Sequence, residues 1–327
     1  MILGDNMEFN VKRDQNYLKE LKDCIINNYG LNISKITKAS RGVDGETWIA
    51  IASRKRYFVK ISYYLSHKAR FINSIKTLNI LNKNKIKYLN SIIKTNNGED
   101  YTNFNNGILA IYTYVKGEID YRYPYNKLIR ILTPVYKIKS DFKGLTYEDL
   151  KIKDLISRVK NEIKSPYDSK LSKVIGDNLD KLNVYLNGLE YYYNRIDKNT
   201  PMYITHGDAC VNVMVSRNEK CLIDWDDSIV APIERDCWFF IDSKEKISYI
   251  NKYFKRNQLN YKLSTDMLFF YAYKRAVEYI DELINKYKTT SYADNLDEIN
   301  EILNGWVSDK LESIKKVWGG HYDANNI

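Results

Sequence analysis

Carboxylate and amide side chains are concentrated in one short stretch of the chain, residues 205–226. It contains Asp208, Asn212 and Asp224, and Asp226 follows closely. Mg²⁺ is a hard cation that binds oxygen atoms, and the side chains of aspartate and asparagine supply them. Phosphoryl transfer needs such oxygens, because there the protein mainly positions a nucleotide, metal ions and an acceptor hydroxyl beside a catalytic aspartate. The residue types of this stretch therefore predict a magnesium site suited to phosphoryl transfer.

A hairpin within this stretch would hold the oxygen ligands in place. Residues 213–215 and 221–223 are short β-prone runs, and the five polar residues between them favour a turn. If the turn is centred on residues 218 and 219, Met214 lies opposite Ile223. Asn212 and Asp224 then lie diagonally across the open end of the hairpin, and Asp208 arrives from the preceding loop.

The motif resembles that of a known superfamily of enzymes. His206-Gly207-Asp208, Asn212 and the run Ile-Asp-Trp-Asp at 223–226 resemble the Brenner-type motif of the aminoglycoside phosphotransferase and choline kinase superfamily. Residues 231–236 and 271–280 resemble the spectinomycin phosphotransferase branch. The resemblance implies a protein-kinase-like fold. It also implies that Asp208 is the catalytic base and that Asn212 and Asp224 are the metal ligands.

The spacing within the motif departs from the family pattern. The family places the asparagine five residues after the catalytic aspartate, whereas Asn212 follows Asp208 by four. One missing residue removes about 3.3 to 3.6 Å of chain reach. A one-residue slip of the hairpin would turn every side chain to the wrong face, so we assign the deletion to residues 209–211 and expect a tighter loop. The alternative is that Asn212 only caps a strand.

A second group of residues is predicted to bind the nucleotide. Gly42 and Gly45 lie in a loop between two predicted strands, where backbone amides can approach a phosphate. Lys60 ends an apolar strand beyond that loop, at the place where the family keeps its phosphate-binding lysine. Tyr112 and Tyr114 lie where the family's hinge offers backbone groups to adenine. The alternatives are an ordinary hairpin turn and a surface lysine.

The expected partner of Lys60 is absent from the sequence. In the family this lysine pairs with a glutamate on the next helix. Here that helix is predicted over residues 67–82 and has no acidic residue. Either a carboxylate from elsewhere in the chain orients Lys60, or its contact with the phosphates is looser than in the family.

Charge is unevenly distributed along the chain, whose formal net charge is +10. Between Glu46 and Glu99 there are eleven Lys or Arg residues and no acidic ones. Acidic residues cluster after position 224 instead, which predicts a small cationic substrate beside an anionic nucleotide. Nucleic-acid binding is the alternative for the basic segment, but no nucleic-acid motif supports it. The acids that we assign tentatively to the substrate are Asp226, Asp227, Glu278 and Asp281.

Composition also limits the class of protein. The four cysteines have neither zinc-ligand nor CxxC spacing, and the three histidines are too scattered for a His-based metal site. No run of residues approaches the ~18 apolar residues of a membrane helix, and no apolar segment follows Met1. We expect a cytoplasmic protein that binds neither membranes nor nucleic acid. The sequence does not indicate its oligomeric state.

The remaining periodicity predicts an α+β fold in two lobes. An opening helix at 17–29 and strands at 33–39, 47–52, 57–61, 91–95 and 107–115 predict a mixed or antiparallel sheet in an N-terminal nucleotide-binding lobe, residues 1–116. Amphipathic segments at 128–138, 147–164, 171–196, 266–286 and 296–317 predict a larger helical lobe, residues 117–327, that carries the catalytic stretch.

These observations predict an O-phosphotransferase. It would use ATP or GTP with Mg²⁺ and act on a hydroxyl of a small aminated molecule, of the aminoglycoside or aminocyclitol type. The alternative is a non-enzyme, a kinase-like scaffold of the spore-coat type with little or no catalysis. The shortened loop and the missing helix glutamate favour the scaffold, whereas the retained oxygen ligands favour the enzyme.

Overall fold

The computed structural model describes residues 13–39, 45–63, 65–139, 142–217, 219–290 and 293–318. Within them the chain forms two compact units. The first extends to Tyr147 and also contains Ile204–Val230, and the second contains Glu148–Tyr203 and the chain from Ala231 onward. The predicted boundary between residues 116 and 117 falls within the first unit. The division into lobes at that point stays a prediction.

The first unit is built on an antiparallel sheet. Its strands are β1 (Lys35–Lys38), β2 (Glu46–Ala52), β3 (Lys55–Ser62), β4 (Ile92–Ile93), β5 (Thr102–Phe104) and β6 (Gly107–Thr113). Their order is β1-β2-β3-β6-β4, and β5 pairs with β6. All of these pairings are antiparallel. Of the two arrangements that the sequence allows, the sheet therefore has the antiparallel one.

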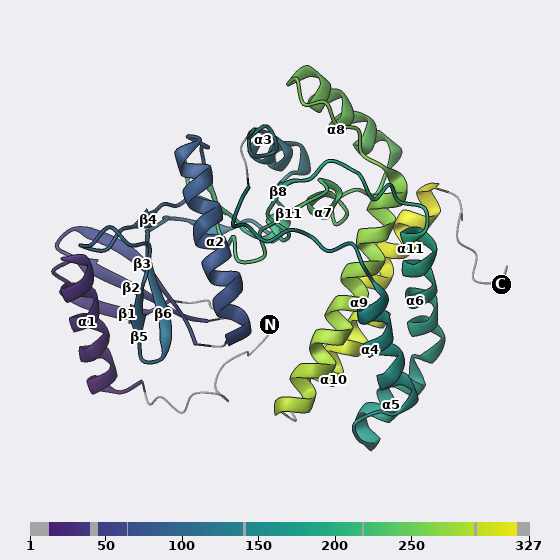
Figure 1. Cartoon of the computed structure of the whole chain (residues 1–327), viewed down its shortest axis with the longest axis horizontal. Helices are drawn as coiled ribbons and strands as arrows, with labels where there is room; N and C mark the ends of the chain where they lie inside the picture. The colour runs from purple at the N-terminus through teal and green to yellow at the C-terminus, as the bar shows by residue number, and fades with distance from the viewer. Residues whose placement is uncertain are drawn as a thin grey trace. The chain divides into compact units, whose positions relative to one another are not determined.

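Two helices of this unit flank the sheet (Figure 1). Helix α1 (Gln15–Tyr29) begins at the cap Asp14 and ends at Gly30, whose φ of 65° places it in the left-handed region. Its apolar face packs on alternate residues of β2, β3 and β6, among them Val59 and Ile61. Because successive side chains of a strand point to opposite faces, Lys60 projects from the face that α1 does not cover.

Helix α2 (Leu65–Lys83) follows β3 directly. Figure 1 shows α1 and α2 on opposite sides of the sheet. Phe71, Ile75 and Leu78 of α2 are buried, and the Nζ of Lys60 lies 5.9 Å from the centre of the Phe71 ring. The lysine therefore points toward the helix that the family uses to orient it.

The stretch that is predicted to be catalytic belongs to the same compact unit. Strands β7 (Glu118–Ile119), β9 (Val213–Val215) and β10 (Lys220–Leu222) form a three-stranded sheet in the order β10-β9-β7. Strands β8 (Tyr203–Thr205) and β11 (Ile229–Ala231) pair with each other. Gly117 precedes β7 with a φ of 141°, and a Cβ there would lie 2.3 Å from the Val215 carbonyl oxygen. Only glycine fits this close approach. Helix α3 (Tyr125–Tyr136) completes the unit.

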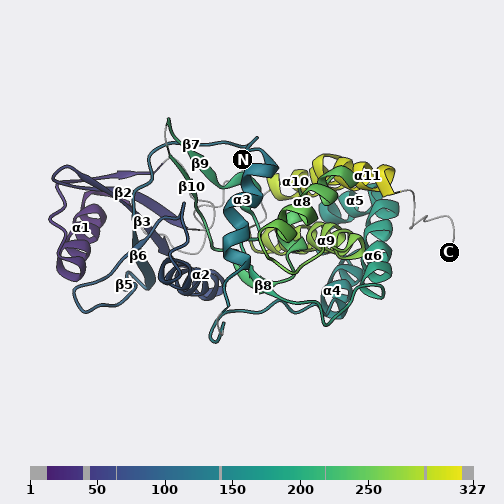
Figure 2. The same cartoon turned by 90° about the horizontal axis from the view of Figure 1, so that it is seen from above.

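The second unit is helical (Figure 2). Its helices are α4 (Lys153–Lys164), α5 (Ser169–Asp177), α6 (Leu179–Tyr193), α7 (Glu234–Cys237), α8 (Lys244–Arg256), α9 (Thr265–Thr290), α10 (Asp294–Asn304) and α11 (Trp306–Trp318). Tyr192 of α6 stacks on Phe269 of α9 with ring centres 4.7 Å apart. A Cβ at Gly188 of α6 would lie 2.6 Å from the Tyr273 ring of α9. The small residue therefore lets these two helices pack closely.

Some predicted helices differ from those in the structure. The helix predicted at 147–164 begins only at Lys153, because Tyr147 forms a bridge with Val230. The helix predicted at 171–196 is divided at Asn178, and the one predicted at 296–317 is divided at Gly305. Helix α8 was not predicted. None of the helices in the described part of the chain combines the length and apolar character that a membrane-crossing segment needs.

Candidate active site

His206 anchors the loop that carries Asp208. The imidazole is fully buried and lies against Trp225, with ring centres 4.6 Å apart. Its Nδ1 accepts a hydrogen bond from the Asp208 backbone N–H at 3.3 Å, and its Nε2 lies 2.9 Å from the Ile223 carbonyl oxygen. These two contacts fit the neutral tautomer in which Nε2 carries the proton. His206 thus connects the Asp208 loop to the strand that leads to Asp224.

The shortened loop is compensated by a tight turn. Residues Ala209–Val211 form a 3-10 helix, so the chain turns more tightly here than in an α-helix. Asn212 follows this turn and is buried. Its Nδ2 donates to the backbone carbonyl of Asp208 at 2.8 Å and to the carboxylate Oδ2 of the same residue at 3.1 Å. The structure therefore brings Asp208 and Asn212 into direct contact.

The register of the β9–β10 hairpin differs from the prediction. Met214 pairs with Cys221 instead of Ile223, and the Ile223 N–H donates to the Asn212 carbonyl at 3.0 Å. The Ser216 N–H donates to the Glu219 carbonyl at 2.8 Å, so the turn is centred one residue earlier than predicted. The pairing is thereby displaced by two residues, which leaves each side chain on its predicted face. Asp224 follows the residue that pairs with Asn212.

Lys60 contacts two carboxylates of the catalytic stretch. Its Nζ lies 2.7 Å from Asp226 Oδ2 and 3.1 Å from Asp224 Oδ1. Burial opposes the charge of the ammonium group, but Asp224 and Asp226 outweigh it and hold the pKa of Lys60 above its usual value. Of the two possibilities that the sequence left open, the structure therefore shows the first: carboxylates from elsewhere in the chain orient the lysine.

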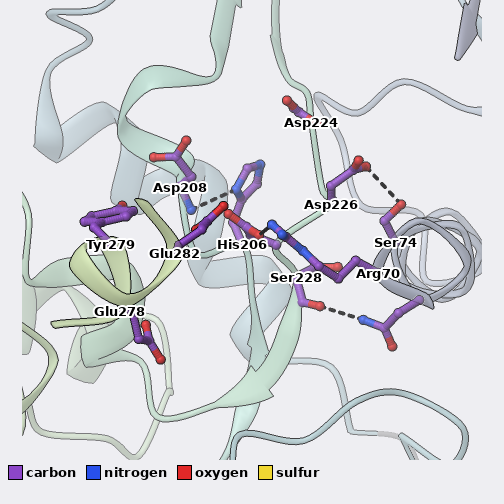
Figure 3. A network of polar contacts seen from close by, with 12 residues as sticks. Arg70, Ser74, His206, Asp208, Asp224, Asp226, Ser228, Glu278, Tyr279 and Glu282 are labelled. Carbon is purple, nitrogen blue, oxygen red and sulfur yellow. Dashed lines mark hydrogen bonds and ion pairs between the residues drawn. The ribbon is translucent and has the colours of Figure 1, made fainter. Parts of the chain in front are cut away.

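Helix α2 contributes polar groups that the sequence reasoning missed. The Ser74 hydroxyl is within hydrogen-bonding distance of Asp226 Oδ1, at 3.2 Å, as Figure 3 shows. Asn73 Nδ2 donates to the Ser228 carbonyl at 2.6 Å, and the Ser228 hydroxyl donates to Thr77 Oγ1 at 3.1 Å. Residues 73, 74 and 77 lie on one helical face. This polar face among apolar neighbours was a visible signal in the sequence.

The predicted nucleotide-binding residues fall in different surroundings. Gly42 lies outside the described residues. Gly45 is buried beside Lys60, and a Cβ there would lie 2.8 Å from the Ile61 carbonyl oxygen and 3.8 Å from Lys60 Cε. Tyr112 is buried on β6, and burial, reinforced by Asp226, raises the pKa of its hydroxyl. Tyr114 is half-buried, and the Cζ atom of Arg56 lies over the Tyr114 ring, 5.6 Å from the ring centre.

Each of the acids assigned tentatively to the substrate is ion-paired. In the first unit, Asp226 pairs with Lys60 and Asp227 pairs with Arg70. In the second unit, Asp281 accepts from Arg158 at 2.9 Å, and Glu278 lies between Lys274 and Arg275. Burial would raise the pKa of Glu278, but the charges of Arg275 and Lys274 outweigh it and hold the pKa below its usual value. The substrate role of these acids stays a prediction.

No group of three or more His, Cys, Asp or Glu side chains within the described ranges could hold a metal ion by itself. A magnesium ion in a kinase-type site is held by one or two protein groups together with the phosphates of its nucleotide. A carboxylate and an amide oxygen are the hard ligands that this requires, and Asp224 and Asn212 supply one of each. The chemistry of the two residues therefore fits Mg²⁺.

The fold is that of known antibiotic kinases. A spectinomycin phosphotransferase in complex with ADP and spectinomycin has a TM-score of 0.68 at 17% identity, covering 94% of this chain and 95% of its own. The AMP-bound complex of spectinomycin phosphotransferase scores 0.71 at 16% identity, covering 93% and 99%. An amicoumacin kinase in complex with AMP-PNP, Ca²⁺ and Ami has a TM-score of 0.59 at 12% identity, covering 91% of this chain and 94% of its own. The predicted kinase-like α+β fold is confirmed.

Sequence comparison identifies the family. No curated protein sequence matches the chain significantly. The family model described as the phosphotransferase enzyme family matches residues 35–262, a span that includes Lys60 and the whole stretch from Asp208 to Asp226. The predicted resemblance to aminoglycoside phosphotransferases is thereby confirmed. Because the match covers more than half of the 327 residues, the chain belongs to the phosphotransferase enzyme family and is an enzyme.

Proposed function

We propose that the protein transfers the γ-phosphoryl group of ATP or GTP to a hydroxyl of a small aminated molecule of the aminoglycoside or aminocyclitol type. The observation that carries this proposal is the joint placement of Asp208, Asn212, Asp224 and Lys60 in one compact unit, with the contacts described above. Membership of the phosphotransferase family and similarity of fold to kinases with bound ADP or AMP-PNP support it.

In this proposal Asp208 receives the acceptor hydroxyl. Its carboxylate is half-buried, and the contact with Asn212 Nδ2 restricts its orientation. A carboxylate held in this way can orient the hydroxyl and accept its proton as the phosphoryl group is transferred. His206 accepts a hydrogen bond from the backbone N–H of the same residue. The residues of the loop thus position one catalytic oxygen.

Asp224 and Asn212 are the residues that would hold Mg²⁺. The Nδ2 of Asn212 donates to Asp208. The other amide atom, Oδ1, is an acceptor and is therefore the atom that can bind a metal ion. Asp224 has a φ of 58° and its side chain is 49% exposed, so its carboxylate can reach a ligand from solvent. When bound, the ion would neutralise charge on the phosphates of the donor. Lys60 would contact the same phosphates. Gly45, which has no side chain, lies next to Lys60 and leaves room there.

The class of acceptor is proposed from charge and similarity together. The spectinomycin and amicoumacin kinases named above have bound antibiotic substrates. Carboxylates attract the ammonium groups of such an acceptor, and dissolved salt screens that attraction. The apparent acceptor affinity should therefore fall as salt rises from roughly 0.05 to 0.5 M, where the screening length shrinks to a few Å. A salt-independent affinity, or turnover of uncharged acceptors only, would contradict this acceptor class.

The two observations that favoured a catalytically inactive scaffold have structural counterparts. The 3-10 turn at 209–211 accommodates the shortened loop, and Asp226 pairs with Lys60 in the absence of a helix glutamate. We therefore do not retain the scaffold as a second candidate.

A phosphoryl-transfer assay tests the proposal. Purified protein is incubated with γ-labelled ATP or GTP, Mg²⁺ and a panel of aminoglycosides, aminocyclitols, amino alcohols and uncharged sugars, with Asp208→Asn as the matched control. We expect transfer to at least one aminated acceptor by the wild type, and transfer slower by about 10² or more in the variant. Equal labelling by both proteins, or none with any acceptor despite nucleotide binding, would refute it.

A further inference from the structure

Asp226 and Asp224 differ in how they contact Lys60. The Asp226 contact is the shorter of the two, 2.7 Å against 3.1 Å. The Asp226 side chain is 19% exposed, whereas that of Asp224 is 49% exposed, and the lysine itself is 12% exposed. The charges of an ion pair that is less exposed to solvent are screened less, so they attract each other more strongly. Asp226 is thus the more tightly held partner of the two.

Helix α2 fixes the second oxygen of Asp226. Ser74 Oγ lies 3.2 Å from Asp226 Oδ1, while Oδ2 of the same carboxylate contacts Lys60. Ser74 is buried, and its one hydroxyl hydrogen is shared between Asp226 and the Phe71 carbonyl, which lies 2.8 Å away. The carboxylate therefore bridges α2 and β3, as a glutamate on the helix would.

The rest of the helix face holds the residues that follow Asp226. Arg70 pairs with Asp227, and Asn73 bonds to the Ser228 carbonyl. Asn73 also accepts from the Thr146 N–H at 2.7 Å, so both ends of its amide are engaged. These contacts fix the backbone from which Asp226 projects. A side chain becomes a reliable positioning group only when its own supports are fixed in this way.

We propose that Asp226 is the positioning residue for Lys60 and takes the part of the glutamate that α2 lacks. Ser74 and Asn73 of α2 hold Asp226 and its segment in place. Asp224 is then the exchangeable partner of Lys60 and is available to the metal ion when a nucleotide binds. This assignment rests on the proposed function, since it concerns the lysine that would contact the phosphates. It replaces a substrate role for Asp226 with an internal one.

Binding of ADP and adenosine to a set of variants tests the proposal. Lys60 would contact phosphates but not the nucleoside, so adenosine reports on the base site alone. We expect Asp226→Asn to weaken ADP binding in the presence of Mg²⁺ at least about tenfold, as loss of a supporting residue commonly does. Adenosine binding should not change. Calorimetric titration measures both constants.

The sign of the effect separates positioning from simple charge. A carboxylate that acted only as a negative charge near the phosphates would tighten ADP binding when it is removed. In a Lys60→Met background there is no lysine to position, so Asp226→Asn should cause no further loss. An equal loss in both backgrounds, a loss of adenosine binding as well, or tighter ADP binding in Asp226→Asn with Lys60 present would each overturn the proposal.

The chain offers a matched control. Asp100 also accepts from a lysine, Lys94, on one oxygen, and from an α2 side chain, Asn79 Nδ2 at 2.7 Å, on the other. Asp100→Asn removes the same charge from the same kind of bridge outside the candidate site. It should bind ADP as the wild type does, and ADP binding weakened as much as in Asp226→Asn would overturn the proposal.

Two further outcomes are informative. If Asp226→Asn does not fold, Ser74→Ala removes only the support from α2 and should weaken ADP binding several-fold in the Lys60 background and not in Lys60→Met. An unchanged ADP affinity in Ser74→Ala would then overturn the proposal. Wild type that binds no ADP would refute the proposed function itself, whereas wild type that binds ADP with unaffected variants would refute only the role of Asp226.

Discussion

Hydrogen bonds hold both the backbone and the carboxylate of Asp208. His206 accepts from its N–H, and Asn212 donates to its carbonyl and its Oδ2. Asp208→Asn should therefore preserve the fold and ADP binding while phosphoryl transfer falls by 10² or more, the order of a lost general base. Turnover and ADP titration measure the two effects. Full activity in the variant would show that Asp208 is not the catalytic residue.

The two proposed metal ligands should differ in their effect on nucleotide binding. Asp224→Ala should weaken ADP binding in the presence of Mg²⁺ and leave binding in EDTA largely unchanged, because the carboxylate acts through the ion. Asn212→Ala should have the same effect more mildly, since an amide oxygen carries no net charge. The check is a titration of ADP at several Mg²⁺ concentrations. If both variants retain the wild-type dependence on Mg²⁺, the proposed metal site is wrong.

The contact between Asp208 and Asn212 could be predicted because the two residues are close in sequence. The hairpin pairs the backbone of Asn212 with that of Ile223, the residue before Asp224, so local pairing also explains how Asp224 follows Asn212 across the strands. The partner of Lys60 could not be found in this way. Asp224 is 164 positions further along the chain, and the contact between Ser74 and Asp226 spans 152 positions. No local pattern specifies which distant carboxylate replaces a missing one.

At the scale of secondary-structure elements, Gly45 marks the place where the glycine loop enters β2 beside β3. A Cβ at this position would lie 2.8 Å from the backbone carbonyl of Ile61, which cannot move without disturbing the strand. Gly45→Ala should therefore lower the free energy of unfolding by roughly 1 to 3 kcal/mol and weaken nucleotide binding. Urea denaturation and ADP titration measure these changes.

The matched control for Gly45→Ala is Gly176→Ala. Gly176 lies in α5, and a Cβ there would have nothing within 4 Å. Alanine should be neutral or stabilising by up to ~1 kcal/mol in a helix. An equal loss of stability in both variants would mean that the close contact with Ile61 is not the cause.

The sequence predicts most of the helices and strands, but not the residues at which several of them begin and end. The strand that follows Gly45 and the strand that carries Lys60 have alternating apolar patterns, and β2 and β3 confirm both. Divisions inside long helical patterns depend on tertiary contacts. Asn178, for example, is buried and bonds to Asn300 at 2.8 Å, where α5 gives way to α6. The register of the β9–β10 hairpin likewise depends on a turn whose length the sequence does not specify.

At the scale of the whole molecule, Glu234 predicts how stability depends on pH. It is fully buried, and burial raises its pKa to about 7, although hydrogen bonds from Tyr261 at 2.5 Å and the Ser264 N–H at 2.7 Å oppose the shift. In the unfolded chain its pKa is near 4.5, the ordinary value for a glutamate side chain. The folded state therefore binds more protons between these values, so the Glu234 contribution favours folding at low pH and is lost as pH rises toward 7.

Glu234→Gln removes this titration while keeping the shape of the side chain: its amide oxygen can still accept from the Ser264 N–H, and its NH2 can donate to the Tyr261 hydroxyl. The free energy of unfolding of the variant, relative to that of the wild type, should rise by about 2 to 3 kcal/mol between pH 5 and pH 8, as the size of the pKa shift implies. Urea denaturation of both proteins at the two pH values measures the difference, and other titrating groups cancel in the comparison. A difference that does not change with pH would contradict the assignment.

The discontinuous first unit has a consequence for the order in which the protein acquires its structure. Residues 204–230 belong to the same compact unit as the sheet, yet the chain of Glu148–Tyr203 intervenes between them. During synthesis the polar face of α2 emerges from the ribosome long before its partners at 226–228. Contacts of such long sequence separation form slowly. The N-terminal unit therefore cannot be completed until roughly two thirds of the chain has been translated, and a nascent chain stalled before residue 226 would leave Asn73 and Ser74 without the contacts that organise Lys60.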